Sequence, residues 1–160
     1  MKLIKRIFFL VILILIIAIL IVGKIGYDYY KQVLDEKSFE DRILAIQNNE
    51  NFIKYDDLAK DYINAVVAAE DHRFFEHGAI DIISIGRAIY TNISSKELQE
   101  GGSTISQQVA KNVFFTQEET LKRKSAELFA SIDLEKKCSK EEIFELYVNT
   151  AYFGNGYYRN

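Results

Sequence analysis

The stretch Ala-Glu-Asp-His-Arg-Phe-Phe-Glu-His-Gly, residues 69–78, decides how this chain is interpreted. The apolar residues 65–69 have the composition of a helix, so Glu70 is expected at a helix end. A carboxylate that leaves a helix into a partly desolvated cleft is suited to proton transfer. Phe74 and Phe75 can form a wall that limits access of water. The alternative is a plain helix C-terminus with solvated charges and two core phenylalanines.

A second polar block, Gly-Gly-Ser-Thr-Ile-Ser-Gln-Gln, occupies residues 101–108. It is a glycine turn that leads into a helix start, where unpaired backbone N–H groups form a natural anion site. Lys111 lies one turn beyond Gln107 and Gln108, so one helix face offers amides and an ammonium group. That combination suits a pyrophosphate or a sugar. The alternative is a plain loop and helix cap, because Gly-Gly before Ser or Thr is a common helix start.

A third block, Arg123-Lys124-x-x-Glu127, lies in the strongest helical segment. Arg123 and Glu127 are four residues apart and Lys124 and Glu127 are three apart, so all three can share a face. A cationic pair beside a carboxylate can hold a diphosphate while the acid positions a sugar or a metal. The alternative is a solvated helix face with salt bridges.

Outside these blocks the pattern is helical, without the alternating β-branched segments that predict strands. The candidate helix N-caps are Asp56 or Asp57, Asp81, Thr104, Thr116 and Ser139. The residues expected to face inward are Ile82, Ile85 and Ile89 in one helix, Leu121, Ser125, Leu128, Phe129 and Ile132 in another, and Ile143, Leu146 and Tyr147 in the last. We therefore predict a mainly α-helical domain in which residues 70–78 and 99–103 are loops.

The N-terminus has the features of a membrane anchor. Residues 7–22 contain no polar side chain, and only basic charges precede them. At ~1.5 Å per residue this run, with its flanks, crosses a hydrocarbon core ~30 Å thick. The positive-inside rule places the N-terminus in the cytoplasm. We assign residues 1–6 to a cytoplasmic tail, 7–26 to the anchor and 27–54 to a membrane-proximal stalk. A cleaved signal peptide is the alternative, although no clear Ala-x-Ala site follows.

Composition further restricts the possible functions and binding sites. The 160 residues suffice for one small domain. The formal net charge is −3, which argues against nonspecific nucleic-acid binding and requires a local basic cluster for any anionic ligand. The single Cys138 excludes an internal disulfide and a multi-cysteine zinc site.

The order of these blocks resembles the peptidoglycan glycosyltransferases, glycosyltransferase family 51. These occur as monofunctional transglycosylases and as the N-terminal domain of class A penicillin-binding proteins. Of the first family motif, Glu-Asp-x-x-Phe-x-x-His-x-Gly, this chain has Glu70, Asp71, Phe74 and His77, with its glycine, Gly78, directly after the histidine. The second motif, Gly-Gly-Ser-Thr-Ile-Ser-Gln-Gln, is present in full. The motifs match residues 70–78, 101–108 with Lys111 and Asn112, 123–127, 140–149 and the beginning of the fifth at 152–154.

This resemblance implies a mainly α, lysozyme-like glycosyltransferase domain at residues 55–160 behind a single transmembrane helix. The implied substrate is lipid II, a disaccharide-pentapeptide on undecaprenyl pyrophosphate, which is joined to the growing glycan strand by an inverting β-1,4 linkage. Glu70 would be the general base and Glu127 the second catalytic acid. The implied substrate-binding residues are Asp71, Phe74, His77, Ser103, Gln107, Gln108, Lys111, Arg123 and Lys124.

The resemblance also implies a cellular location, protein partners and a cofactor. The domain would lie on the outer face of the plasma membrane, with cell-wall elongation or division proteins as partners and no nucleic acid. A divalent cation, Mg²⁺ or Mn²⁺, would bind near Glu127, and no organic cofactor is implied.

Two departures from the family pattern bear on these expectations. Relatives often carry an arginine before the third motif, where this chain has Glu118 and Glu119. Family domains also continue past the fifth motif, whereas this sequence ends at Asn160, so we expect a C-terminally truncated domain. Two other functions remain open: lytic transglycosylase or lysozyme-like cleavage of glycan, and a non-catalytic, truncated remnant that binds lipid II. A cleaving enzyme would need a protonated acid and no pyrophosphate site.

Overall fold

The computed structural model describes residues 2–95, 102–116 and 120–151, and within these ranges it contains helices and no strand. The helices are α1 (Lys2–Glu36), α2 (Phe39–Gln47), α3 (Lys60–Glu70), α4 (Ile82–Ser95), α5 (Ile105–Phe114), α6 (Leu121–Lys137) and α7 (Lys140–Thr150), with 3₁₀ turns η1 (Tyr55–Asp57) and η2 (Phe74–Glu76). The mainly α prediction is confirmed. Gly101, Glu118, Glu119 and the fifth motif lie outside the described residues.

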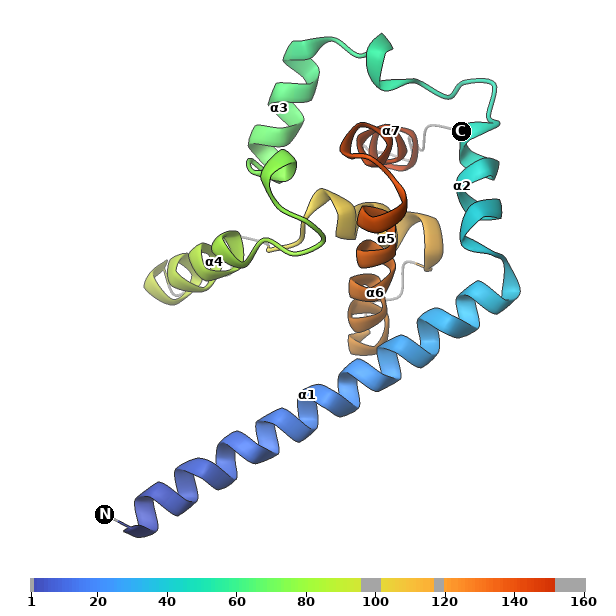
Figure 1. The fold of residues 1–160 in the computed structure, drawn as a ribbon. Helices are drawn as coiled ribbons and strands as arrows, with labels where there is room; N and C mark the ends of the chain where they lie inside the picture. Colours follow the sequence, from blue (N-terminus) through green and yellow to red (C-terminus); the bar gives the residue numbers. More distant parts are fainter. Residues whose placement is uncertain (1, 96–101, 117–119, 152–160) are drawn as a thin grey trace.

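Helix α1 is one continuous rod that passes through the predicted tail, the anchor and the first part of the stalk (Figure 1). It is long and apolar enough to cross a membrane, with a mean hydropathy of 3.2 over its most apolar stretch. Its C-terminal part packs on α6, where Tyr30 and Val33 are buried. A Cβ at Gly26 would lie 2.2 Å from Ser125 Oγ, so glycine permits this close approach of the two helices.

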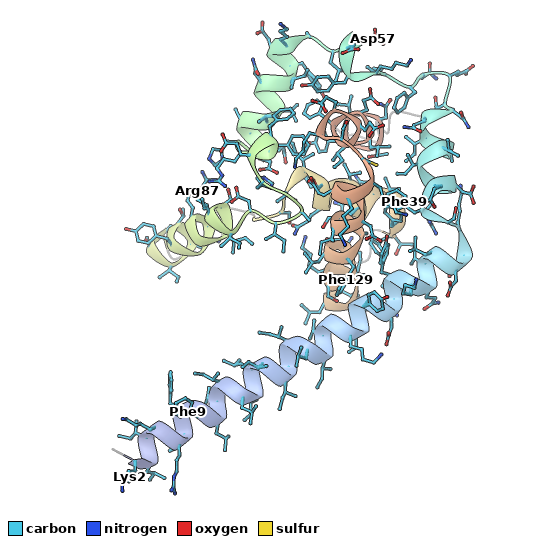
Figure 2. The ribbon with its side chains drawn as sticks, in the orientation of Figure 1. Lys2, Phe9, Phe39, Asp57, Arg87 and Phe129 are labelled. Carbon is cyan, nitrogen blue, oxygen red and sulfur yellow. The ribbon has the colours of Figure 1, made fainter. Side chains whose placement is uncertain are left out.

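The core lies among α5, α6 and α7, and α2 closes one side (Figures 1 and 2). The largest fully buried apolar side chains are Phe74, Phe144, Ile105, Leu134, Ile143, Leu146, Val109 and Val148. Burial of each such side chain stabilises the fold by ~1.5–3 kcal/mol. Because α5 contributes two of them at its first and second turns, the start of this helix is held firmly in place.

Two predicted helix starts are confirmed as full capping boxes, at Thr104 and Ser139. Two others are wrong. The helix expected from Thr116 begins four residues later, because the Thr120 hydroxyl accepts from Arg123 N and caps the helix there. Asp56 and Asp57 lie in η1, and α3 begins only at Lys60.

The prediction of inward-facing residues is correct for α7 and only partly correct elsewhere. Ile82 is 79% exposed, because α4 lies beside the helical cluster and no core covers that position (Figure 1). Ile85 is half-buried. In α6, Leu121 is exposed and the most buried face carries Arg123 and Glu127. The alternative interpretation of this block as a solvated, salt-bridged helix face is therefore wrong.

The segment before α3 is fastened to α7 by side chains of the fourth motif. Asn149 Oδ1 accepts from Ile53 N at 3.0 Å, and Asn149 Nδ2 donates to Ile53 O at 2.9 Å. The side-chain amide thus satisfies both backbone groups of Ile53, as a neighbouring backbone segment would. Glu145 accepts from Tyr55 N at 2.8 Å. These bonds hold the segment that leads into α3 against α7.

Candidate active site

Glu70 is the last residue of α3, as its apolar N-terminal flank predicted. Its side chain is exposed, so the expected partial desolvation is wrong in this structure. Glu70 Oε2 accepts from Gln108 Nε2 at 2.8 Å across 38 residues of sequence. The first and second motifs thus meet directly at the carboxylate that was predicted to act as the base.

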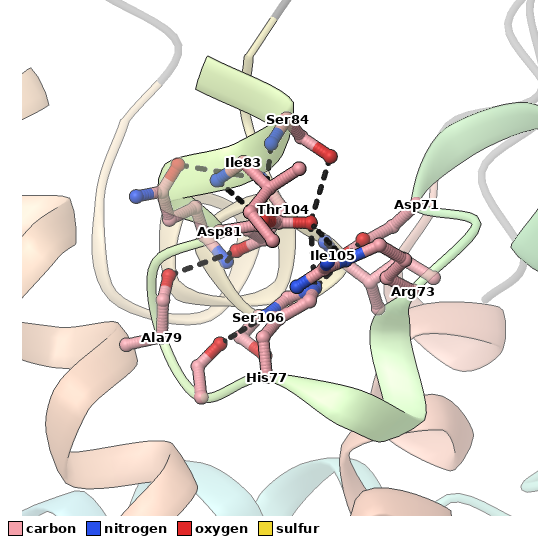
Figure 3. A network of polar contacts seen from close by, with 12 residues as sticks. Asp71, Arg73, His77, Ala79, Asp81, Ile83, Ser84, Thr104, Ile105 and Ser106 are labelled. Carbon is pink, nitrogen blue, oxygen red and sulfur yellow. Dashed lines mark hydrogen bonds and ion pairs between the residues drawn. The ribbon is translucent and has the colours of Figure 1, made fainter. Parts of the chain in front are cut away.

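A buried polar network lies behind Glu70 and joins α3, α4 and α5 (Figure 3). Asp71 Oδ2 accepts from Ile105 N at 3.1 Å, at the first turn of α5. Asp71 Oδ1 lies 2.8 Å from His77 Nε2. Thr104, the N-cap of α5, donates to Ala79 O at 3.1 Å. The loop after Glu70 is therefore bound to the helix that carries Gln108.

Asp81 anchors the other end of this loop. It caps α4, where Oδ1 accepts from Ile83 N and Ser84 N, and its Oδ2 accepts from Ser84 Oγ and from Arg73 Nε. Desolvation alone would raise the pKa of Asp81. The hydrogen bonds from Ser84 and the nearby positive charge outweigh it and lower the pKa to about 2.

Three residues predicted to bind substrate are built into this support. Phe74 is fully buried under Phe144 and beneath the Lys140 ammonium, 4.4 Å from the ring centroid, so it packs the core and presents no surface to a ligand. The side chains of Asp71 and His77 are also almost completely buried. The interpretation of Phe74 as a wall of the site is therefore corrected: the ring lies behind it, because the 3₁₀ turn η2 directs it inward.

The remaining predicted residues meet in one pocket of about 490 Å³ between α5 and α6. Its polar lining consists of Ser103, Gln107, Gln108, Lys111, Thr120, Arg123, Lys124 and Glu127. The pocket therefore unites the second and third motifs, and Gln108 connects it to Glu70.

Glu127 organises the cations of this pocket. Only 1% of its side chain is exposed, and it lies 3.1 Å from Arg123 Nε and 2.9 Å from Lys124 Nζ. Lys124 Nζ also donates to Ser103 Oγ at 2.9 Å, which ties α6 to the start of α5. Arg123 Nε and Glu127 Oε1 are close but lack hydrogen-bond geometry with each other or with any other described group. Both atoms are buried, so their interaction is a contact between opposite charges inside the protein.

The pocket is a poor site for a resident divalent cation. Such ions take several oxygen ligands, and among the described lining residues Glu127 is the one carboxylate, already neutralised by two cations. The buried network behind Glu70 places three potential ligand atoms within 4.8 Å of one another, but hydrogen bonds engage their side chains. Neither group, with its side chains paired as they are here, offers free ligands for a metal, so the cation expected near Glu127 stays a prediction and we assign no step to it.

An apolar groove of about 520 Å³ continues from the polar pocket toward α1. Ser103, Gln107, Leu121 and Lys124 line both spaces. The groove adds the apolar residues Val22, Ile80, Ile85 and Leu128. Because Val22 belongs to the apolar stretch of α1, the groove leads from the cationic pocket to the membrane-spanning candidate helix.

Sequence reasoning gave no site role to Tyr147, although it placed this residue on the inner face of α7. Burial and the negative charge of nearby Glu70 raise the pKa of Tyr147 to about 12. Its phenol is therefore a protonated hydrogen-bond donor near the candidate base. Arg73 was likewise missed as the partner of Asp81, because the two lie eight positions apart on either side of the turn η2.

Comparisons with known proteins match the part of the chain that contains this site. The Transglycosylase family model matches residues 37–159, which begins before α2 and includes both motifs of the pocket. The chain is 41% identical over 127 residues to penicillin-binding protein 1F of Bacillus subtilis, covering 79% of this chain and 18% of that protein. It is 36% identical over 134 residues to a monofunctional glycosyltransferase of Staphylococcus aureus, covering 84% and 48%. The chain thus spans less than half the length of these relatives, and it belongs to the transglycosylase family.

Proposed function

We propose that this chain is a peptidoglycan glycosyltransferase domain that polymerises lipid II into β-1,4 glycan strands and releases undecaprenyl pyrophosphate. One observation carries the proposal: Gln108 bonds the exposed Glu70 carboxylate and also lines the cationic pocket. A base and a site for a diphosphate leaving group are therefore adjacent, as attack by a sugar hydroxyl on a glycosyl diphosphate requires.

Glu70 is the general base in this proposal. It takes the proton from the 4-hydroxyl of the acceptor GlcNAc while that oxygen forms a bond to C1 of the donor MurNAc. The bond from C1 to the diphosphate oxygen breaks on the opposite side, which inverts the α-linked donor to a β linkage. A placed base contributes ~10²–10⁴-fold, and orientation of the two sugars supplies much of the rest. The Tyr147 phenol lies near enough to Glu70 for the carboxylate charge to raise its pKa, so it stays protonated beside the base.

The pocket between α5 and α6 receives the departing diphosphate. Lys111, Arg123 and Lys124 supply positive charge where negative charge develops, and such stabilisation is among the largest contributions to catalysis. Ser103 and Gln107 donate hydrogen bonds to the diphosphate or the sugar. Glu127 acts by holding Arg123 and Lys124 in place.

The apolar groove suits the hydrocarbon chain of a lipid-linked substrate. It begins at the cationic pocket and ends at Val22 on α1, so a head group in the pocket leaves its lipid directed toward the bilayer. Helix α1 has the length and composition of a membrane anchor, and α4 exposes Ile82, Ile83 and Ile93. In this proposal the N-terminus is cytoplasmic and the domain lies on the outer face of the plasma membrane.

The test is a gel assay of glycan products from labelled lipid II with the full chain in detergent micelles. We expect polymer from lipid II and no fragments from finished glycan. Release of fragments from glycan would overturn the proposal in favour of a cleaving enzyme. Binding of lipid II without polymer would support the non-catalytic remnant, and the same assay on a longer gene product would show whether further sequence restores activity.

A further inference from the structure

The His77 ring lies between two hydrogen-bond acceptors. Its Nδ1 is 2.6 Å from Gly78 O, and its Nε2 is 2.8 Å from Asp71 Oδ1. A carbonyl oxygen cannot donate, and an ionised carboxylate cannot either. A neutral imidazole has one N–H, so it would leave a lone pair facing one of these oxygens. Both contacts are satisfied together only if one additional proton resides on the pair of His77 and Asp71.

The surroundings place that proton on the ring. Imidazole binds a proton more strongly than a carboxylate does in water. Asp71 Oδ2 accepts from Ile105 N, and a hydrogen bond of this kind favours the ionised carboxylate. The pair is buried, with 5% of the His77 side chain and 3% of the Asp71 side chain exposed.

The charge balance agrees with this assignment. Among the described residues, the charged groups of this cluster are Asp71 at the end of α3 and Asp81 at the start of α4, which face His77, and Arg73, which pairs with Asp81. His77 Nε2 lies 4.0 Å from Asp81 Oδ2, and Arg73 Nε lies 3.1 Å from the same oxygen. Two carboxylates and one guanidinium are neutral as a group only when the imidazole is cationic. An uncompensated charge in a buried cluster is costly.

We infer that His77 is a cationic positioning residue for the candidate base. Its ring, with a hydrogen on each nitrogen, holds Asp71 against the Ile105 N–H (Figure 3). Asp71 follows Glu70 directly, and Ile105 lies one turn before Gln108, so this contact determines how Glu70 and Gln108 meet. The inference replaces the substrate contact that the sequence suggested for His77. It rests on the proposed function only for its activity measurement.

The sequence makes a direct spectroscopic test feasible, because the chain has two histidines and the other, His72, is exposed. The full ¹⁵N-labelled chain is washed with EDTA, placed in detergent micelles and examined by NMR at neutral pH. We expect two slowly exchanging ring N–H signals from His77 and none from His72. A single ring N–H signal from His77 would overturn the inference.

The Asp71→Asn variant sharpens this test. Its amide oxygen can still accept from Ile105 N, while its NH₂ group can donate to an unprotonated Nε2. We expect the Nε2–H signal to disappear and the Nδ1–H signal to remain. Retention of both signals in a folded variant would contradict the inference. If Asp71→Asn does not fold, the wild-type spectrum alone decides.

The activity measurement compares His77→Gln with His72→Gln in the lipid II assay. Misplacement of the base should lower kcat ~10- to 100-fold with little change in KM, whereas the control should stay within about twofold of wild type. A rise in KM at unchanged kcat would overturn the inference in favour of substrate contact. If the chain does not polymerise lipid II at all, the proposed function fails while the NMR result still decides this inference.

Discussion

Glu70 and Glu127 are two carboxylates with opposite surroundings. Glu70 ends a helix, faces solvent and receives one hydrogen bond from the neutral amide of Gln108. Glu127 lies in the middle of α6, is almost completely buried and is flanked by two cations. An exposed carboxylate can reach a substrate hydroxyl and exchange a proton with it. A buried, neutralised carboxylate is suited to holding its partners in position, so the two environments suit the same residue type to different roles.

The two regions also differ in how they are held. The loop behind Glu70 is fixed by hydrogen bonds between side chains and backbone groups, such as those from Ile105 N to Asp71 and from Thr104 Oγ1 to Ala79 O. The pocket around Glu127 is held by charge and has a lysine, Lys124, whose side chain is 52% exposed. We expect the first region to tolerate little change in geometry, and the second to respond to a ligand that brings negative charge.

Glu70→Gln should have the largest effect. Glutamine has nearly the same shape and keeps an oxygen that Gln108 can bond, but it cannot take a proton. The rate of lipid II polymerisation should fall ~10²–10⁴-fold while lipid II binding stays nearly unchanged. Initial rates and a binding titration measure the two quantities. Glu76→Gln, an exposed carboxylate on η2, is the control, and undiminished polymerisation by Glu70→Gln would rule out the base assignment.

Glu127→Gln should act on stability. It leaves Arg123, whose side chain is 10% exposed, beside Lys124 without the shared carboxylate. Loss of one partner of a buried ion pair costs ~3–5 kcal/mol in the free energy of unfolding. Denaturant titration in micelles measures this, with the exposed Glu141→Gln as control. Equal stability of the two variants would show that Glu127 does not hold the pocket together.

Lys124→Met should separate binding from stability. An ion pair with one half-exposed partner contributes ~1 kcal/mol at most, so unfolding should change little. Loss of a charged hydrogen bond to a diphosphate should weaken lipid II binding roughly tenfold. The control is Lys122→Met on the same helix, because the Lys122 ammonium lies 4.1 Å from the Tyr29 ring centroid and outside the pocket. If Lys124→Met lost as much stability as Glu127→Gln, the two residues could not be said to differ in their contributions to binding and stability.

Asp81→Asn should lower stability at neutral pH and lose this difference from wild type in acid. The pKa of Asp81 is lowered from 3.8 to about 2 in the folded protein, so this group adds stability that is complete above about pH 4. That stability is lost as the pH falls toward 2. The variant should therefore show a shallower fall of Tm between pH 5 and pH 2 than wild type. The exposed Asp61→Asn should keep the wild-type slope, and identical slopes for all three proteins would contradict the shifted pKa.

Local features of the sequence were sufficient for the α-helical class, the apolar first helix and the capping boxes at Thr104 and Ser139. Each depends on residues within a few positions of one another, because helix periodicity and capping involve short-range hydrogen bonds. The order of the motifs likewise predicted Glu70 and the residues of the cationic pocket, but not the contact between them.

Only the tertiary structure decided which of these residues are exposed and which are buried. The contacts that expose Glu70, bury Glu127 and enclose His77 join segments far apart in the chain, such as Asp71 with Ile105, 34 residues later, and Glu70 with Gln108. Burial and charge compensation arise from packing among helices, and a motif does not carry that information. The sequence therefore identified the candidate residues, whereas packing among the helices set the distances between them and the solvent exposure of each.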